Sequence, residues 1–254
     1  MRMRSAQAGV SMSVIALVGV AGLWLATSSA GAKAPVTARH AVAAAVERGT
    51  AYGCAGNCFS LYSRELGTGK TMSVLIPADN GRGGAVGRRL NLSTARNHQP
   101  DSNFIPAQVG QVRQFCGAQA NKFFSPTAYV CAHYARFWMF EATWAPFGNE
   151  SDLCAGVAVA GRANQAVTLQ RCGTSDRTLW ILDRANGLSG DCRSPGNFCP
   201  WVSASNAPTG PPLVLTLAIR SPDLPDQLKI EPLQLAGRTA GRDQEFAYFW
   251  GPVI

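Results

Sequence analysis

Short apolar runs alternate with turns rich in Gly, Pro, Asn and Asp from residue 54 to the C-terminus. This pattern is typical of β-strands joined by turns. No stretch has the sustained 3.6-residue apolar period of an amphipathic helix. The chain therefore predicts an all-β domain, with a barrel or a sandwich as the two architectures to consider.

The strands recur in three groups that share one order. Each group begins with a strand led by a cysteine, continues with further strands and ends on an aromatic residue. The leading cysteines and closing aromatic residues are Cys58 with Phe104, Cys154 with Trp180, and Cys199 with Phe246. This repetition predicts three hairpins whose inward aromatic residues help to fill one shared core.

The first 32 residues have the features of a secretory signal peptide. Arg2 and Arg4 are followed by the 13-residue apolar run Val14–Ala26 and by the small-residue cleavage site Ala30–Ala32. A bilayer span needs about 20 apolar residues, so an uncleaved anchor is the weaker alternative. We expect a secreted, extracellular protein with an N-terminal arm at residues 33–53, a folded domain at 54–254, and no stable membrane insertion after cleavage.

All eight cysteines lie after the expected cleavage site: Cys54, Cys58, Cys116, Cys131, Cys154, Cys172, Cys192 and Cys199. An even number in an exported chain indicates disulfides more than a metal site, and we expect no metal. The spacing favours Cys154–Cys172 first, and then Cys116–Cys131 and Cys192–Cys199. Cys54–Cys58 is the pair that remains.

The stretch Leu153–Leu182 resembles one subdomain of a ricin-type (ricin B-like) β-trefoil, the fold of many secreted carbohydrate-binding modules. The region from Cys58 onward, including Trp144–Gly148, also resembles a group of secreted actinobacterial proteins of unassigned function. The resemblance implies an elaborated, disulfide-bonded β-trefoil with insertions. A β-sandwich remains the structural alternative.

The closing aromatic residues are 76 and 66 residues apart, which exceeds a typical trefoil repeat. The excess predicts insertions, chiefly at Gln111–Asn149 and Ser221–Arg242. The first insertion is itself strand-like at Tyr129–Val130 and at Phe137–Trp144. We interpret it as the return strand of the first repeat together with an embellishment.

The family resemblance also implies where sugar would bind. Such modules use an aspartate near the first strand, an aromatic platform, and an Asn-Gln pair before the anchor. Here the position two residues after each leading cysteine is Ser60, Gly156 or Trp201, and the glutamine survives only as Gln244, beside Asp243. Asp243 and Gln244 are therefore candidate ligand-binding residues, with a structural role for Gln244 as the alternative.

A cluster of aromatic residues in the first insertion is the second candidate site. Trp138 and Trp144 could present a ring to the apolar face of a sugar. In an alternating strand half of such residues point inward, so core packing is the alternative for each of them.

The remaining chemistry-bearing patterns are weak. Gly67–Thr71 lacks the first glycine of a phosphate loop, His98 and His133 lie in no metal-binding repeat, and no Gly-x-Ser-x-Gly elbow is present. We expect no enzyme activity, no catalytic residue, no cofactor and no nucleic-acid partner.

The formal net charge of +8 favours anionic partners such as acidic glycans or wall polymers, and it also fits a mildly basic solvated surface. The function predicted is a non-catalytic module that recognises carbohydrate or a cell-wall polymer. The alternative is a protein-interaction or inhibitor module on the same fold, and a hydrolase with an unmarked acid pair is a third, weaker one. The sequence leaves the oligomeric state open.

Overall fold

The computed structural model describes residues 58–74, 84–94, 102–117, 126–173, 175–188, 197–205, 209–218 and 226–250. These residues belong to one compact unit of the chain. The expected signal peptide and arm lie outside the described residues, as do Cys54 and Cys192.

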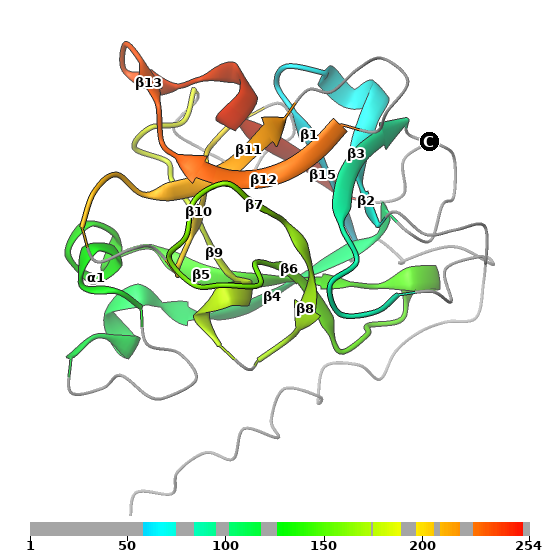
Figure 1. The fold of residues 1–254 in the computed structure, drawn as a ribbon, viewed down its shortest axis with the longest axis horizontal. Coiled ribbons are helices and arrows are strands. Elements are labelled where there is room, and N and C mark those ends of the chain that lie inside the picture. The colour runs from blue at the N-terminus through cyan, green and yellow to red at the C-terminus, as the bar shows by residue number, and fades with distance from the viewer. Residues whose placement is uncertain are drawn as a thin grey trace, which may run out of the picture. The chain divides into compact units, whose positions relative to one another are not determined.

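The described chain is mostly β-structure, with one short α-helix and several 3-10 turns (Figure 1). The strands are β1 (Phe59–Ser63), β2 (Lys70–Val74), β3 (Leu90–Thr94), β4 (Phe104–Gln111), β5 (Trp138–Trp144), β6 (Leu153–Gly156), β7 (Gln165–Ala166), β8 (Thr168–Arg171), β9 (Leu179–Leu182), β10 (Trp201–Ser203), β11 (Leu213–Ala218), β12 (Asp226–Pro232), β13 (Leu235–Ala236), β14 (Thr239–Ala240) and β15 (Phe246–Trp250). The helices are α1 (Ala128–Tyr134), η2 (Gly67–Gly69), η4 (Val112–Phe115), η6 (Pro146–Gly148), η7 (Asp176–Thr178) and η8 (Arg242–Gln244).

Three repeats of four strands build the domain. In each repeat a first strand leads into an antiparallel hairpin, and a last strand returns beside the first. The repeats are β1–β2–β3–β4, β5–β6–β8–β9 and β10–β11–β12–β15, with hairpins β2–β3, β6–β8 and β11–β12. The expected threefold plan is therefore present in the strand pairing.

The first and last strands of the three repeats form a closed ring. Neighbouring strands pair in the order β15–β1–β4–β5–β9–β10. A bridge between Cys199, just before β10, and Phe246 in β15 closes the ring. A closed barrel leaves no exposed strand edge.

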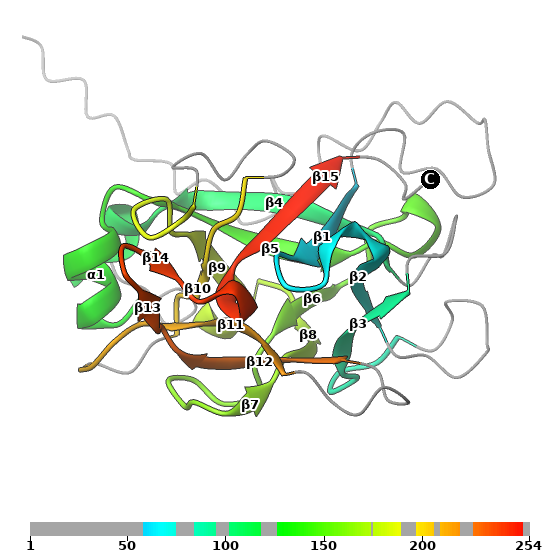
Figure 2. The same cartoon turned by 90° about the horizontal axis from the view of Figure 1, so that it is seen from above.

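The three hairpins are joined to one another at one end of this barrel. β12 pairs with β3 and with β7, and a bridge between Arg89 and Thr168 joins the first hairpin to the second. Figure 2 shows β3, β8 and β12 together at one side, with β4 and β15 across the opposite side. A six-stranded barrel capped by three hairpins is a β-trefoil, so the predicted fold class is confirmed.

The register of the barrel repeats three times. Each closing aromatic residue pairs with one position on the first strand of its own repeat and with one on the first strand of the next. These pairs are Phe104 with Phe59 and Trp144, Trp180 with Phe140 and Ser203, and Phe246 with Cys199 and Ser63. On every first strand the two positions are four residues apart, so each position in one repeat has a defined equivalent in the others.

The closing aromatic residues fill the barrel as predicted. Phe104, Trp180 and Phe246 are fully buried in one apolar cluster. The indole Nε1 of Trp180 donates a hydrogen bond of 2.9 Å to the carbonyl oxygen of Ala155 in the second hairpin. The anchor therefore joins the barrel to its cap through both packing and a hydrogen bond.

The second repeat begins earlier than the sequence predicted. Its first strand is β5, which we had interpreted as the return strand of the first repeat, whereas the strand led by Cys154 is the first strand of the hairpin. The return strand of the first repeat is β4, which pairs with β5 along most of its length. The leading cysteine thus marks a first strand at Cys58 and Cys199 only.

The predicted strand at Tyr129–Val130 is wrong, because these residues lie in α1. The Oγ1 of Thr127 caps the helix by accepting a hydrogen bond of 3.4 Å from the backbone N–H of Val130. Val130 and Tyr134, four residues apart, are buried against a second apolar cluster. Capping and this spacing outweigh the strand preference of Tyr and Val.

The predicted insertions coincide only in part with the extra structure. η4 and α1 lie between β4 and β5, as the first insertion predicts. The range Ser221–Arg242, however, contains β12, which is a hairpin strand of the third repeat. The added element there is the small hairpin β13–β14.

Two predicted disulfides are confirmed. Cys154–Cys172 clips the hairpin β6–β8, and Cys116–Cys131 joins the end of η4 to α1. Cys58 and Cys199 each also belong to a disulfide, but not with each other. The predicted pairs Cys54–Cys58 and Cys192–Cys199 each include a cysteine outside the described residues, so they stay predictions.

Candidate functional site

A cavity of about 840 Å³ lies at the end of the barrel opposite the hairpins. Its position follows from the topology, because its lining comes from the beginnings of first strands and from the ends of last strands. Pro106, Leu182 and Tyr248, each two residues after a closing aromatic residue, all line it. The cavity is therefore centred on the threefold arrangement of the barrel, and the mouth of a β-barrel is a common ligand site.

Aromatic side chains make up half of the cavity lining. They are Phe59, Phe137, Trp138, Phe140, Trp201 and Tyr248. Trp138 is the most exposed of these rings, with 42% of its surface exposed. Trp201, in contrast, is 2% exposed. Trp201 packs against Phe140 and Phe59 with ring centroids 4.9 Å and 5.8 Å apart. The cavity thus has a rigid aromatic base and one accessible indole.

Trp201 also carries a buried donor. Its indole Nε1 has no hydrogen-bond partner among the described residues. A buried N–H left without an acceptor costs about 1–3 kcal/mol.

Three polar side chains complete the lining, namely Gln108, Arg136 and Arg184. All three are exposed. Gln108 precedes an irregularity in the pairing of β4 with β5, where the register shifts between Gln108 and Gly110. A β-bulge of this kind redirects the side chains beside it.

Neither cavity arginine is neutralised by an acid in the described structure. The ion pairs that the described residues form involve other side chains. No Asp or Glu is among the residues that line the cavity. The site is therefore cationic as well as aromatic.

A buried network includes two residues that are close to the arginines in the chain, Tyr134 near Arg136 and Asp183 beside Arg184. The hydroxyl of Tyr134 donates a hydrogen bond of 3.1 Å to the Oδ2 of Asp183. Asp183 also accepts from the side-chain amide of Asn186 at 2.7 Å and from the backbone N–H of Ala185 at 3.0 Å. Burial, and then the charge of Asp183, raise the pKa of Tyr134 far above its ordinary value, so the phenol stays a donor.

Of the residues predicted to bind ligand, Trp138 lies in the cavity and the others do not. Trp144 is 3% exposed and belongs to the main apolar core. A Cβ placed on Gly84 would lie 1.8 Å from the Trp144 ring, which shows how closely the backbone covers it. Core packing therefore accounts for Trp144.

Gln244 is also buried, in η8. Its Nε2 donates to the carbonyl oxygen of Pro232 at 2.9 Å and to the Oγ1 of Thr216 at 3.1 Å, and its Oε1 accepts from the backbone N–H of Gln234 at 2.7 Å. These bonds hold the third hairpin, so the structural alternative applies to Gln244. Asp243 is half-buried beside it and does not line the cavity.

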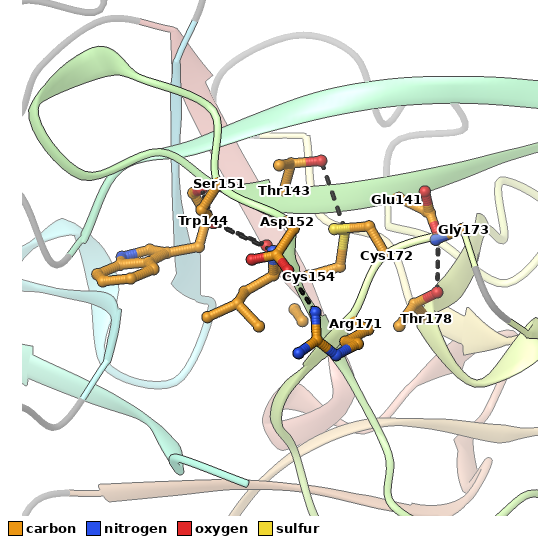
Figure 3. Close-up of a disulfide and its surroundings, with 12 residues drawn as sticks. Glu141, Thr143, Trp144, Ser151, Asp152, Cys154, Arg171, Cys172, Gly173 and Thr178 are labelled. Carbon is orange, nitrogen blue, oxygen red and sulfur yellow. Dashed lines mark hydrogen bonds and ion pairs between the residues drawn. A yellow bond between two sulfur atoms is a disulfide. The ribbon is translucent and has the colours of Figure 1, made fainter. Parts of the chain in front are cut away.

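Glu141, Cys154 and Cys172 place a carboxylate and two sulfur atoms within 4.8 Å of one another (Figure 3). Both sulfur atoms belong to the disulfide and offer no thiolate. The Oε1 of Glu141 accepts hydrogen bonds of 2.7 Å from the backbone N–H of Gly173 and from the Oγ1 of Thr178. This cluster therefore braces the hairpin and has no ligand set for a metal.

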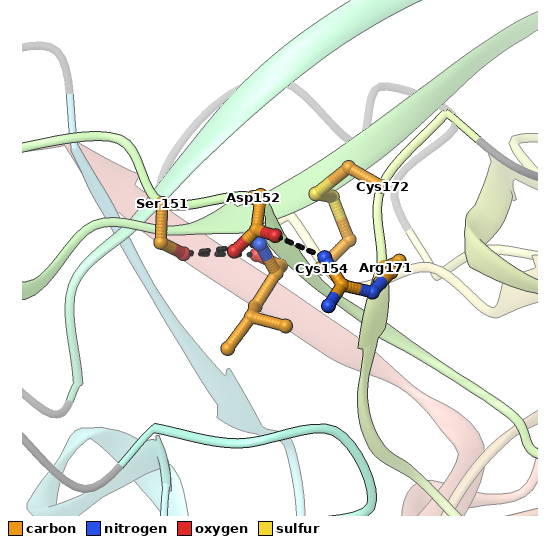
Figure 4. A network of polar contacts seen from close by, with 6 residues as sticks. Ser151, Asp152, Cys154, Arg171 and Cys172 are labelled. Atoms are coloured by element: carbon orange, nitrogen blue, oxygen red, sulfur yellow. Dashed lines mark hydrogen bonds and ion pairs between the residues drawn. A yellow bond between two sulfur atoms is a disulfide. The ribbon is translucent and has the colours of Figure 1, made fainter.

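The surface beside the same disulfide carries an exposed ion pair (Figure 4). Arg171 and Asp152 meet at 2.6 Å, with 67% and 70% of their side chains exposed. An exposed pair contributes little to stability. The backbone N–H of Cys172 also donates a hydrogen bond to the carbonyl oxygen of Asp152. These contacts therefore join the same two strands as the disulfide does.

No motif in the sequence marked Arg136, Arg184, Gln108 or Trp201 as site residues. A signal was present, because Gln108 and Arg184 each lie four residues after a closing aromatic residue. In a strand, the positions two and four residues after an inward aromatic residue point to the same face. Extending each last strand toward its end would have placed both residues at the barrel mouth.

No protein-family model and no curated protein matches this sequence. Among solved structures, the chain is similar to a designed threefold-symmetric protein, ThreeFoil, with a TM-score of 0.46 and 10% identity, over 76% of this chain and 97% of that one. The β-trefoil assignment rests on the strand pairing described above. None of the described helices has the length and apolar character needed to cross a membrane.

Proposed function

We propose that this protein is a non-catalytic carbohydrate-binding module that holds a glycan at the open end of its barrel. The cavity that carries the proposal combines an exposed indole, a rigid aromatic base and amide and guanidinium donors. The resemblance to ricin-type modules supports a sugar ligand, although their binding aspartates are missing here. The site proposed therefore differs from the one that the resemblance implied.

The chemistry of the lining suits a sugar ring. The apolar face of a pyranose packs on an indole, which Trp138 presents with 42% of its surface exposed. Gln108 can donate to one hydroxyl and accept from another, because its amide has both kinds of group. The volume of about 840 Å³ is in the range of small-ligand sites.

The same lining supports binding over catalysis. Its twelve residues include no carboxylate, histidine, serine or cysteine that could act as a general acid, general base or nucleophile. The disulfides fit an oxidising compartment, which supports the proposal that the protein is secreted.

A glycan array with the purified protein, followed by calorimetry on the ligands it identifies, tests this function. Trp138→Ala should weaken binding at least tenfold and Trp138→Phe should restore part of it, because a ring is retained. Leu235→Ala is the matched control, since Leu235 is 55% exposed and lies outside the cavity. A protein that binds no glycan on the array would overturn the proposal and favour the protein-interaction alternative.

A further inference from the structure

The two arginines of the cavity approach it from different parts of the chain. Arg136 lies between α1 and β5, and Arg184 follows β9. Both side chains are exposed and line the same cavity. No acid is among the described residues that line this cavity, so an anion that entered it would meet two guanidinium groups, each of which attracts it.

The nearest acid does not serve as that anion. Asp183 is adjacent to Arg184 in the chain, but it is fully buried. Its two carboxylate oxygens already accept from Tyr134, Asn186 and the backbone of Ala185. Asp183 therefore holds the backbone in place beneath Arg184 and leaves the guanidinium group available.

We infer that the cavity selects a negatively charged sugar, whose carboxylate or phosphate is bound by Arg136 and Arg184 while its ring packs on Trp138. This inference rests on the proposed function and names its ligand class. A guanidinium group matches the geometry of a carboxylate or phosphate with two parallel hydrogen bonds. Both guanidinium groups are exposed, so salt should screen their attraction for the anion.

Oligogalacturonates and their methyl esters test the inference, because the pair differs in charge and keeps the same sugar ring. Calorimetry should show at least tenfold tighter binding of the free acid, with an affinity that falls as salt is raised. Glycans ending in mannose 6-phosphate, compared with the same glycans without phosphate, form the second arm. A charge preference seen only with the oligogalacturonates identifies carboxylate as the group bound. A preference seen only with the phosphorylated glycans identifies phosphate.

Substitution assigns the effect to residues. Arg136→Gln with Arg184→Gln should remove most of the preference for the charged ligand. The double variant Arg162→Gln with Arg238→Gln removes the same charge from exposed arginines outside the cavity and should keep the preference. Because all four arginines are exposed, melting curves of both variants should match that of the parent.

The outcomes separate this inference from the proposed function. Equal binding of acid and ester that is still lost in Trp138→Ala overturns the charge selection and leaves glycan binding in place. An equal loss of preference in the control double variant assigns the effect to net charge and also overturns the inference. Absence of binding to every glycan overturns both.

Discussion

Tyr134 and Asp183 are 49 residues apart in the chain, yet a buried hydrogen bond of 3.1 Å joins them. Tyr134 ends α1 two residues before Arg136, and Asp183 immediately precedes Arg184. One contact therefore ties together the two segments that bring positive charge to the cavity. The disulfide Cys116–Cys131 anchors the same helix to η4.

Removing this hydroxyl should change how stability depends on pH. The folded state keeps Tyr134 protonated because burial and Asp183 raise its pKa above the ordinary 10.0. Above pH 10 the unfolded chain releases this proton and the folded chain does not, so the group contributes stability below pH 10 that is lost as pH rises. The loss for one proton is about 1.4 kcal/mol per pH unit.

Tyr134→Phe should accordingly be less stable by about 1–3 kcal/mol at pH 7, where the bond to a carboxylate is lost. Between pH 10 and 11 its stability should fall less steeply than that of the parent. Urea denaturation at pH 7, 10 and 11 measures both effects. Parallel curves for Tyr134→Phe and the parent above pH 10 would contradict the raised pKa of Tyr134.

Trp180→Ala should destabilise the protein by about 3–5 kcal/mol, because it opens a cavity in the barrel core and removes the hydrogen bond to Ala155. Trp138→Ala makes the same chemical change at an exposed site and should cost less than about 1 kcal/mol. Chemical denaturation compares the two. Similar losses would mean that Trp180 is not the anchor of its repeat.

Cys172→Ala should remove the clip on the β6–β8 hairpin. The cross-link closes a loop of 18 residues, for which chain entropy gives about 3 kcal/mol. The melting temperature should fall, and thiol titration should find one free thiol, at Cys154. Peptide mapping that joined Cys154 to another cysteine in the parent would contradict the pairing.

Gln244→Ala should destabilise by about 1–3 kcal/mol, since it removes the buried hydrogen bonds to Thr216, Pro232 and Gln234. Asp243→Ala should change stability little and should leave glycan affinity unchanged if the barrel mouth is the site. Calorimetry on Asp243→Ala decides between the two candidate sites. A tenfold loss of affinity there would move the site to the third repeat.

The sequence by itself determined the features whose signals are local. Alternating apolar runs predicted strands, and the short loop between Cys154 and Cys172 predicted their disulfide. The recurrence of Phe104, Trp180 and Phe246 predicted the threefold core. Large buried side chains must fill the barrel, and each repeat supplies one at the start of its last strand. The strand predicted at Tyr129 and Val130 was wrong because helix and strand signals are ambiguous in so short a segment.

Only the tertiary structure decided which strands are equivalent and where the cavity lies. β5 takes the first place in the second repeat because it pairs with both β4 and β9, and no local pattern records a partner on another strand. The cavity draws on residues from Phe59 to Tyr248, one or a few from each strand end. These residues meet because the barrel closes, and closure depends on pairing between segments far apart in the chain.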